Sequence, residues 1–237
     1  MTRIDDPEFV REHYSSERGL EGRRAAYRHA QGPDPRELAY RAVAEARPHR
    51  VLEVGCGPGE LAARIKDELE AEVVAVDVSP RMVDLAVERG VDARQGDVQD
   101  LPFGTGEFDC AVAAWMLYHV PDLERGLSEL RRVVRPGGRL VAVTNGVEHM
   151  GELAELLHVQ PMMRSASFRC DNAPELLGRH FDRVERRHAG GWVVFPAREE
   201  AQAYVDSTAV LSGPGRELPP FEGPIRVRRS ACVLVAE

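Results

Sequence analysis

Residues 51–59 read VLEVGCGPG, and this stretch decides the fold that the sequence predicts. An apolar, β-branched run leads directly into three glycines, Gly55, Gly57 and Gly59, and a segment of helical periodicity follows. Gly55 permits the sharp turn between strand and helix. Gly57 and Gly59 let the backbone approach a bound ligand, and the first free N–H groups of the helix attract an anionic group. The stretch therefore predicts a strand, a turn and a helix that hold a ligand.

Short β-branched runs alternate with amphipathic segments from Val51 onward, a pattern typical of βαβ units. We expect strands at 50–54, 72–77, 91–97, 108–117, 139–145, 183–188 and 226–237. We expect helices at 59–70, 80–89, 122–134, 150–159 and 173–180. The pattern predicts an α/β fold with a doubly wound, mostly parallel, seven-stranded sheet.

Two acidic residues near the glycine turn indicate the kind of ligand. Asp77 ends the second strand eighteen residues beyond Gly59, where a carboxylate can accept both hydroxyls of a ribose. Glu60 stands where dinucleotide-binding turns have glycine or alanine. Glu53 would repel a pyrophosphate and would attract an α-ammonium group, although it could also simply cap N–H groups of the turn. The residues favour a zwitterionic, adenosine-containing ligand over NAD.

Further motifs follow the turn in order: GDVQDLPF (96–103), FDCAVAAWMLYHVPD (108–122) and LRRVVRPGGRLVAVTNG (130–146). Together with E-x-G-x-G-x-G they resemble the class I, Rossmann-like methyltransferases that use S-adenosylmethionine (SAM), of the ubiquinone/menaquinone-biosynthesis and small-molecule type. The likeness extends over residues 51–145. It implies SAM as cofactor, S-adenosylhomocysteine (SAH) as product, no metal, and a helical lid formed by the N-terminal segment.

The resemblance also implies which side chains contact the cofactor. The residues implied are Tyr14, Glu53, Gly55, Gly57, Gly59, Asp77, Val78, Met82, Asp97, Val98 and Ala114. Met82 could instead belong to the core, and Asp97 could cap a turn.

The acceptor is expected above the carboxyl ends of the fourth and fifth strands, where open α/β sheets bind ligands. Trp115, Tyr118 and Asn145 are the expected substrate contacts there. His119 and His149 follow these two strands, so each is a candidate catalytic base near neutral pH. Each could also have a structural role, His119 by fixing a loop and His149 as a capping or solvent-facing residue.

These residues predict methyl transfer from SAM to an O, N or C atom of a small secondary metabolite or quinone-like acceptor. The alternatives are a non-catalytic SAM- or SAH-binding protein and, on the same fold, an NAD-dependent dehydrogenase. A net charge of −8 disfavours a nucleic-acid substrate.

The chain of 237 residues is expected to form one domain, with a lid at 1–47, a SAM-binding core at 48–146 and a substrate-side part at 147–237. The segment 188–211 is expected to line the acceptor site. No stretch predicts a signal peptide or a membrane span. The four dispersed cysteines predict free thiols and a cytoplasmic protein. We expect a monomer or a homodimer.

Overall fold

The computed structural model describes residues 4–6, 8–10, 22, 25–208, 211 and 215–237. Its centre is a seven-stranded sheet in the order β4-β3-β2-β5-β6-β10-β7. The strands are β2 Arg50–Val54, β3 Glu72–Asp77, β4 Asp92–Gln95, β5 Phe108–Ala114, β6 Val134–Asn145, β7 Val184–His188 and β10 Ala231–Ala236. The first five are parallel, and β10 runs antiparallel to both β6 and β7. The predicted doubly wound, mostly parallel sheet is confirmed.

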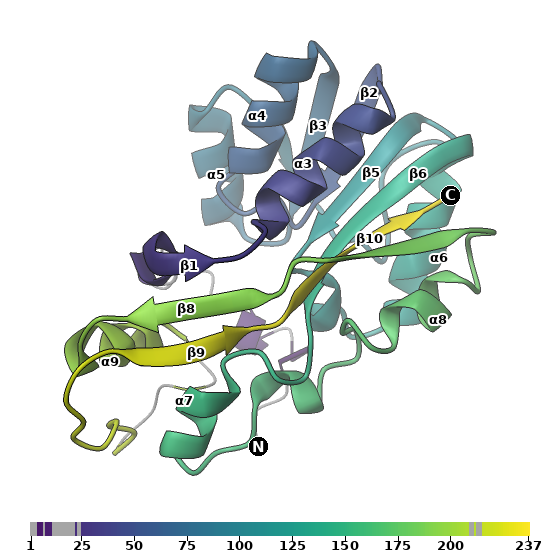
Figure 1. Cartoon of the computed structure of the whole chain (residues 1–237). Coiled ribbons are helices and arrows are strands. Elements are labelled where there is room, and N and C mark those ends of the chain that lie inside the picture. Colours follow the sequence, from purple (N-terminus) through teal and green to yellow (C-terminus); the bar gives the residue numbers. More distant parts are fainter. Residues whose placement is uncertain (1–3, 7, 11–21, 23–24, 209–210, 212–214) are drawn as a thin grey trace.

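Helices cover both faces of this sheet (Figure 1). One face carries α3 Pro35–Glu45, α4 Glu60–Leu69 and α5 Pro80–Glu88, and the other carries α6 Leu123–Val133 and α8 Ala173–Leu177. Asp34, Ser79 and Asp122 accept hydrogen bonds from backbone N–H groups in the first turns of α3, α5 and α6. These side-chain caps explain where the three helices begin.

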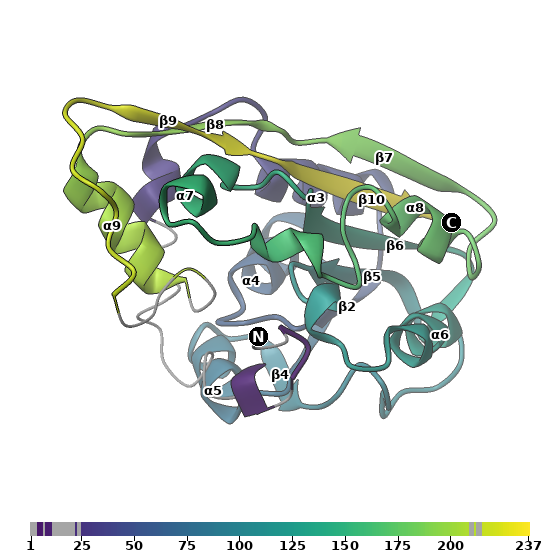
Figure 2. The ribbon, with the colours of Figure 1, turned by 90° about the horizontal axis from the view of Figure 1, so that it is seen from below.

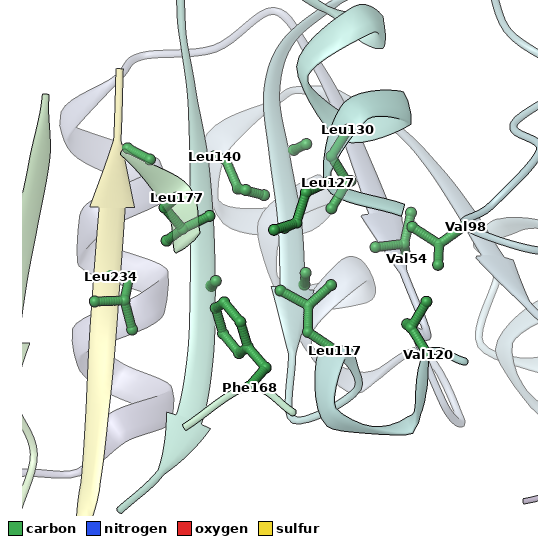
Figure 3. Packing of buried hydrophobic residues seen from close by; sticks show 14 of the residues in the cluster. Val54, Val98, Leu117, Val120, Leu127, Leu130, Leu140, Phe168, Leu177 and Leu234 are labelled. Atoms are coloured by element: carbon green, nitrogen blue, oxygen red, sulfur yellow. The ribbon is translucent and has the colours of Figure 1, made fainter. Parts of the chain in front are cut away.

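The buried strands supply apolar side chains to both faces. Leu52 and Val54 of β2 point to the side covered by α6, whereas Val51 points to the side covered by α3 and α4. Figure 3 shows Leu127 and Leu130 of α6 packed on the first of these faces, with Phe168 and Leu177 beside them. Burial on both faces explains the near-continuous apolar runs of the central strands.

A smaller antiparallel sheet lies beside the main one, and the sequence patterns did not predict it. It has the order β1-β8-β9 and consists of β1 Ala30–Gln31, β8 Gly191–Phe195 and β9 Ile225–Arg229. Strand β7 leads directly into β8, and β9 leads directly into β10. Because β7 pairs with β10 and β8 pairs with β9, the four strands form a long two-stranded ribbon that joins the two sheets (Figure 2). Two further helices, α7 Gly151–Leu156 and α9 Arg198–Ser207, pack against the smaller sheet.

Three expected strands have different limits. The fifth, 139–145, begins already at Val134, so Pro136, Gly137 and Gly138 lie within β6. The last one, 226–237, is divided at Ser230, because the ribbon passes there from one sheet to the other. The fourth, 108–117, ends at Ala114, because Trp115 adopts a left-handed conformation with φ 55°. A short 3₁₀ helix, Leu117–His119, continues the chain. The expected strand therefore ends earlier and turns its aromatic residues out of the sheet.

The expectation of four free thiols is wrong. Cys170 and Cys232 form a disulfide, and their Cα atoms are 5.8 Å apart. Cys232 lies in β10, and the segment before α8 brings Cys170 against it, so a separation of 62 residues hides the pairing in the sequence. Cys56 and Cys110 are buried free thiols, as predicted.

The N-terminal part does not all behave as a lid. Helix α3 buries Ala39, Ala42 and Val43 completely against α4, β6 and β10, so residues 35–45 belong to the core. A boundary at residue 47 is therefore misplaced. Within the described residues, no helix has the length and apolar character needed to cross a membrane.

Replacing Leu127 by alanine tests the packing in Figure 3. Leu127 is 0% exposed, so the truncation should lower the free energy of unfolding by about 2–5 kcal/mol. Val87→Ala is the matched control, because Val87 lies on α5 and is 53% exposed. Chemical denaturation should show little change for that control, within about 0.5 kcal/mol. Equal losses for the two variants would contradict the packing.

Candidate functional site

The three glycines of the turn have different surroundings, although each has a positive φ. A Cβ atom on Gly55 would lie 2.6 Å from Cβ of Met116, and one on Gly59 would lie 2.7 Å from Cβ of Ala86. A Cβ on Gly57 would meet no atom within 4 Å. The missing side chain of Gly59 therefore makes room for α5, not for a ligand as we had expected. Gly57 alone leaves open space above the turn.

Asp77 joins the end of β3 to the glycine turn. Its side chain accepts hydrogen bonds from the backbone N–H of Gly57 at Oδ2 and of Ser79 at Oδ1, both at 2.9 Å. Asp77 is buried, and burial raises the pKa of its carboxyl group while these hydrogen bonds oppose the rise. Each carboxylate oxygen can accept a further hydrogen bond. Asp77 can therefore hold the turn and still accept a pair of ribose hydroxyls.

Glu53 is a buried acid beneath the same turn. It is 3% exposed, and its Oε2 atom has no hydrogen-bond partner among the described residues. Burial raises the pKa of Glu53 to about 8; a hydrogen bond from the Ala62 backbone opposes the rise, and the charges of Asp77 and Glu60 add to it. A buried, unpartnered acceptor favours a cationic or hydrogen-bonding ligand group, such as an α-ammonium group.

The remaining residues expected around adenine differ in exposure. Val78 is 40% exposed at the end of β3, and Ala114 is half-buried at the end of β5. The side chains of Met82 and Val98 are buried. The carboxylate of Asp97 accepts hydrogen bonds from the backbone and side chain of Gln99, so it caps a turn. Tyr14 lies outside the described residues.

Trp115 and Asn145 meet at the carboxyl ends of β5 and β6. The indole Nε1 of Trp115 donates a hydrogen bond to Oδ1 of Asn145 at 3.2 Å. Asn145 is 7% exposed, and the bond fixes both side chains at this edge of the sheet. The structure thus brings together two of the three expected substrate contacts. The third, Tyr118, is buried and packs its ring against that of His119, with centroids 4.5 Å apart.

The two candidate histidines have different partners. Nδ1 of His119 lies 2.6 Å from the carbonyl oxygen of Ile4, so His119 fixes the N-terminal segment. Nε2 of His149 lies 3.2 Å from the hydroxyl of Tyr27. Its Nδ1 is buried beside the Ser230 backbone without a hydrogen bond of normal geometry. Burial lowers the pKa of His149 to about 4, so the imidazole is neutral near pH 7.

Three residues near His149 were missed by the sequence reasoning: Tyr27, Tyr204 and Arg229. They come from the short helix before β1, from α9 and from the end of β9, which no family motif covers. Tyr204 does lie in 188–211, the segment expected to line the acceptor site. An isolated tyrosine or arginine in such a segment carries no spacing signal.

A separate cavity of about 210 Å³ is lined by Glu45, Arg139, Arg183, Glu185, Arg187, Val235 and Glu237. The cavity lies near the amino end of β6 and the carboxyl end of β10. This is the end of these strands that lies away from Asn145. Its arginines form ion pairs with its glutamates, such as Arg139 with Glu237 at 2.6 Å. This cavity is therefore no part of the site described above.

Comparison with known proteins agrees with the geometry. The family model described as "Methyltransferase domain" matches residues 52–142. Over these residues the chain is similar to that family, and its fold is that of solved SAM-dependent methyltransferases.

Among the relatives of this chain, the demethylmenaquinone methyltransferase of Thermus thermophilus is 37% identical over 115 residues, which are 46% of this chain and 52% of that protein. An O-methyltransferase of Aspergillus nomiae is 32% identical over 142 residues, which are 54% of this chain and 63% of that protein. A Thermotoga maritima structure, described as a SAM-dependent methyltransferase and possible histamine N-methyltransferase, has a TM-score of 0.61 at 21% identity. It aligns over 95% of this chain and 98% of its own.

The similarity to curated relatives is confined to part of each protein. The chain spans 52%, 46% and 44% of the length of three demethylmenaquinone methyltransferases that it matches. The Thermotoga structure, under a quarter identical, shows the shared fold. The matched segment 52–142 contains the glycine turn and Asp77 but ends before Asn145 and His149.

Two alanine substitutions separate the roles of the glycines. Gly57→Ala should lower the free energy of unfolding by about 1–2 kcal/mol, the cost of a side chain at positive φ. It should also weaken SAM binding about tenfold or more, because the new methyl group enters the open space. Gly59→Ala should cost more stability, because its Cβ would meet Ala86 at 2.7 Å. Chemical denaturation and SAM calorimetry check both; an equal stability loss would refute the distinction.

The pKa of Glu53 predicts a pH-dependent stability. Its pKa is about 8 in the folded protein against an ordinary value of 4.5, so the folded state holds an extra proton between these values. The contribution of Glu53 to the free energy of unfolding therefore falls as pH rises through this window. Glu53→Gln should gain stability relative to the unchanged protein from pH 5 to pH 8, about the window between the two pKa values.

Denaturation at several pH values measures this difference in the ligand-free protein. Glu88→Gln serves as control, because Glu88 is an exposed glutamate at the end of α5. The stability difference for that control should stay constant with pH. A constant difference for Glu53→Gln as well would contradict the raised pKa.

Proposed function

We propose that this protein transfers a methyl group from SAM to a small-molecule acceptor and releases SAH. The observation that carries the proposal is the buried Glu53, which has an unpartnered oxygen and lies two residues before the glycine turn. An acid at this place suits the α-ammonium group of SAM and opposes a pyrophosphate. Asp77, one strand away, supplies the ribose acceptors.

Each part of the cofactor has a matching group in this arrangement. The backbone at Gly55 and Gly57 and the first turn of α4 would hold the methionine carboxylate. Asp77 would hold the ribose, and Val78 together with the backbone near Asp97 and Val98 would border the adenine. The side chain of Met82 is buried, so it would support the adenine site only by packing under it. Ala114, at the end of β5, would border the methionine part.

The acceptor then lies over β5 and β6. Neighbouring strands are about 4.8 Å apart, so Asn145 on β6 lies three strand spacings from Asp77 on β3. Trp115, Tyr118 and Asn145 would contact the acceptor there. SAM supplies an activated methyl carbon: the new bond to the acceptor forms as the C–S bond breaks, sulfur keeps the electron pair, and the acceptor proton leaves to a base or to water.

Of the two histidines, His149 is the stronger candidate for contact with the acceptor, because its Nε2 lies in a hydrogen bond with Tyr27 that a substrate hydroxyl can replace or share. Its pKa of about 4 makes it a weak base, so the acceptor proton would leave mainly to water. His119 is held by the Ile4 carbonyl and would act by fixing the chain at Ile4. The names of the relatives support a quinone-like or other secondary-metabolite acceptor for this chain.

The alternative is a protein that binds SAM or SAH without catalysis. It would share Glu53, Gly57 and Asp77 but would need no polar groups at the acceptor edge, whereas this chain places Trp115, Asn145 and His149 there. An NAD-dependent dehydrogenase is disfavoured by Glu53 and Glu60. A net charge of −8 also disfavours a nucleic-acid substrate.

The cellular location and the oligomeric state of the protein are further proposals. A cytoplasmic monomer or homodimer stays our expectation, although the Cys170–Cys232 bond removes the free-thiol argument for a reducing compartment.

The first experiment is calorimetric titration with SAM, SAH and NAD, followed by a screen for transfer of labelled methyl groups to small hydroxyl, amine and carbon acceptors. Binding of SAM and SAH without NAD, together with transfer, supports the proposal. Binding without transfer to any acceptor supports the non-catalytic alternative, and binding of NAD alone overturns the assignment of the glycine turn.

Asp77→Asn tests the ribose contact. The amide keeps the shape of the side chain but loses the charge-assisted hydrogen bonds, so SAM and SAH should each bind more weakly by about 1–3 kcal/mol. Thermal unfolding of the same variant controls for damage to the turn, which Asp77 also holds through Gly57. Unchanged affinity in a folded variant would remove Asp77 from the cofactor site.

A further inference from the structure

A buried guanidinium group lies beside the acceptor half of the site. Arg229 is the last residue of β9 and is 4% exposed, whereas Arg226 and Arg228 of the same strand are exposed. Alternation along the strand places Arg229 on the inner face with the fully buried Val227. Arg229 thus points inward, and the other two point to solvent.

The charge of Arg229 has no acidic partner in the described part of the chain. Its Nη2 donates to the carbonyl oxygens of Pro33 at 2.6 Å and Gln31 at 3.4 Å. Its Nε is buried without a hydrogen-bond partner, and none of the ion pairs among the described residues includes it. Backbone carbonyls satisfy some of its donors but do not neutralise a full charge. A buried, uncompensated cation is costly and favours an anion nearby.

The charge of Arg229 acts on Tyr27 and His149, whose Oη and Nε2 atoms are 3.2 Å apart. It lowers the pKa of both, although burial raises the pKa of Tyr27 overall. Tyr204 hydrogen-bonds to Tyr27, and Tyr118 is a further electrostatic neighbour. Among the described residues, Arg229 is the cation that acts on the Tyr27 hydroxyl.

The position of this cluster connects it to the acceptor. His149 follows Asn145, the last residue of β6, by four positions, and the backbone of Gly146 donates to Ser230, the residue after Arg229. Asn145 in turn holds Trp115. Tyr27 and His149 are both residues of intermediate burial.

We propose that Tyr27, His149 and Arg229 form a site for the acceptor oxygen in its anionic form, so that the enzyme methylates acidic hydroxyl groups such as phenols and enols in preference to amines. This inference rests on the proposed function. The Tyr27 hydroxyl donates a hydrogen bond to the oxygen, and the positive charge favours the oxyanion over the neutral hydroxyl. The same charge repels an ammonium group. An oxyanion is also the stronger nucleophile.

The test uses 4-nitrophenol as probe with the protein saturated with SAH, because nitrophenolate absorbs visible light and the phenol does not. Absorbance titrations over the pH range in which the free phenol ionises give the acid dissociation constant of the bound probe. We expect binding to raise that constant about tenfold or more, a pKa shift of one unit.

Matched variants assign the effect to one residue. Arg229→Gln should abolish the shift, and Arg229→Lys should keep most of it, because lysine retains the charge. Arg226→Gln is the control, since it removes an equal charge from the exposed face of the same strand. Thermal unfolding identifies variants that fail to fold. If Arg229→Gln is one of them, Tyr27→Phe replaces it, because this variant removes only the hydroxyl. Tyr27→Phe should reduce the pKa shift of the bound phenol.

The result for the unchanged protein decides the inference without any variant. Binding of the protonated phenol in preference to the phenolate, or binding of neither, overturns it. Equal shifts in Arg229→Gln and Arg226→Gln also overturn it, and leave Arg229 as a clamp for residues 31–33. Calorimetry with SAH in the same samples keeps the two proposals apart, because intact SAH binding with a failed probe titration rejects only the acceptor site.

Discussion

The hydrogen bond from the Gly57 N–H to Asp77 is the contact on which the cofactor half of the site depends. It ties the turn after β2 to the end of β3, and the second carboxylate oxygen orders the entry to α5 through Ser79. The left-handed backbone at Gly57 directs this N–H to Asp77 and leaves the other side of the turn open. Gly59 then allows α4 and α5 to pack closely, so one glycine serves the ligand and another serves the fold.

The residues that we propose for this half of the site could be identified from the sequence because their signals are local. Residues 51–77 contain the strand, the glycine turn, Glu53 and Asp77. The parallel register of β2 and β3 then places Asp77 beside the turn. The sequence could not show that Gly59 faces Ala86, because that contact depends on how two helices pack. The early end of β5 at Trp115 was missed for a similar reason: apolar residues continue to Leu117, but the backbone has already turned.

The acceptor half was predictable only where it lies on the family motifs. Trp115, Asn145 and His149 follow strands that the pattern identifies, so their convergence could be expected. Tyr27 and Arg229 are 202 residues apart and meet through a small sheet whose first strand has two residues. The disulfide between Cys170 and Cys232 was equally hidden in the sequence, because it forms only when β10 pairs antiparallel with β6. Long-range pairing of short strands leaves no periodic signal.

The two halves of the proposed site have opposite electrostatics. On the cofactor side, Glu53 is protonated near pH 7 without a ligand, because burial raises its pKa to about 8. A bound ammonium group would stabilise the ionised form and release that proton. On the acceptor side the fixed charge is positive and stays so, because an arginine does not titrate in proteins. The cofactor half thus adjusts its charge to a cationic ligand, whereas the acceptor half selects the ionisation state of its ligand.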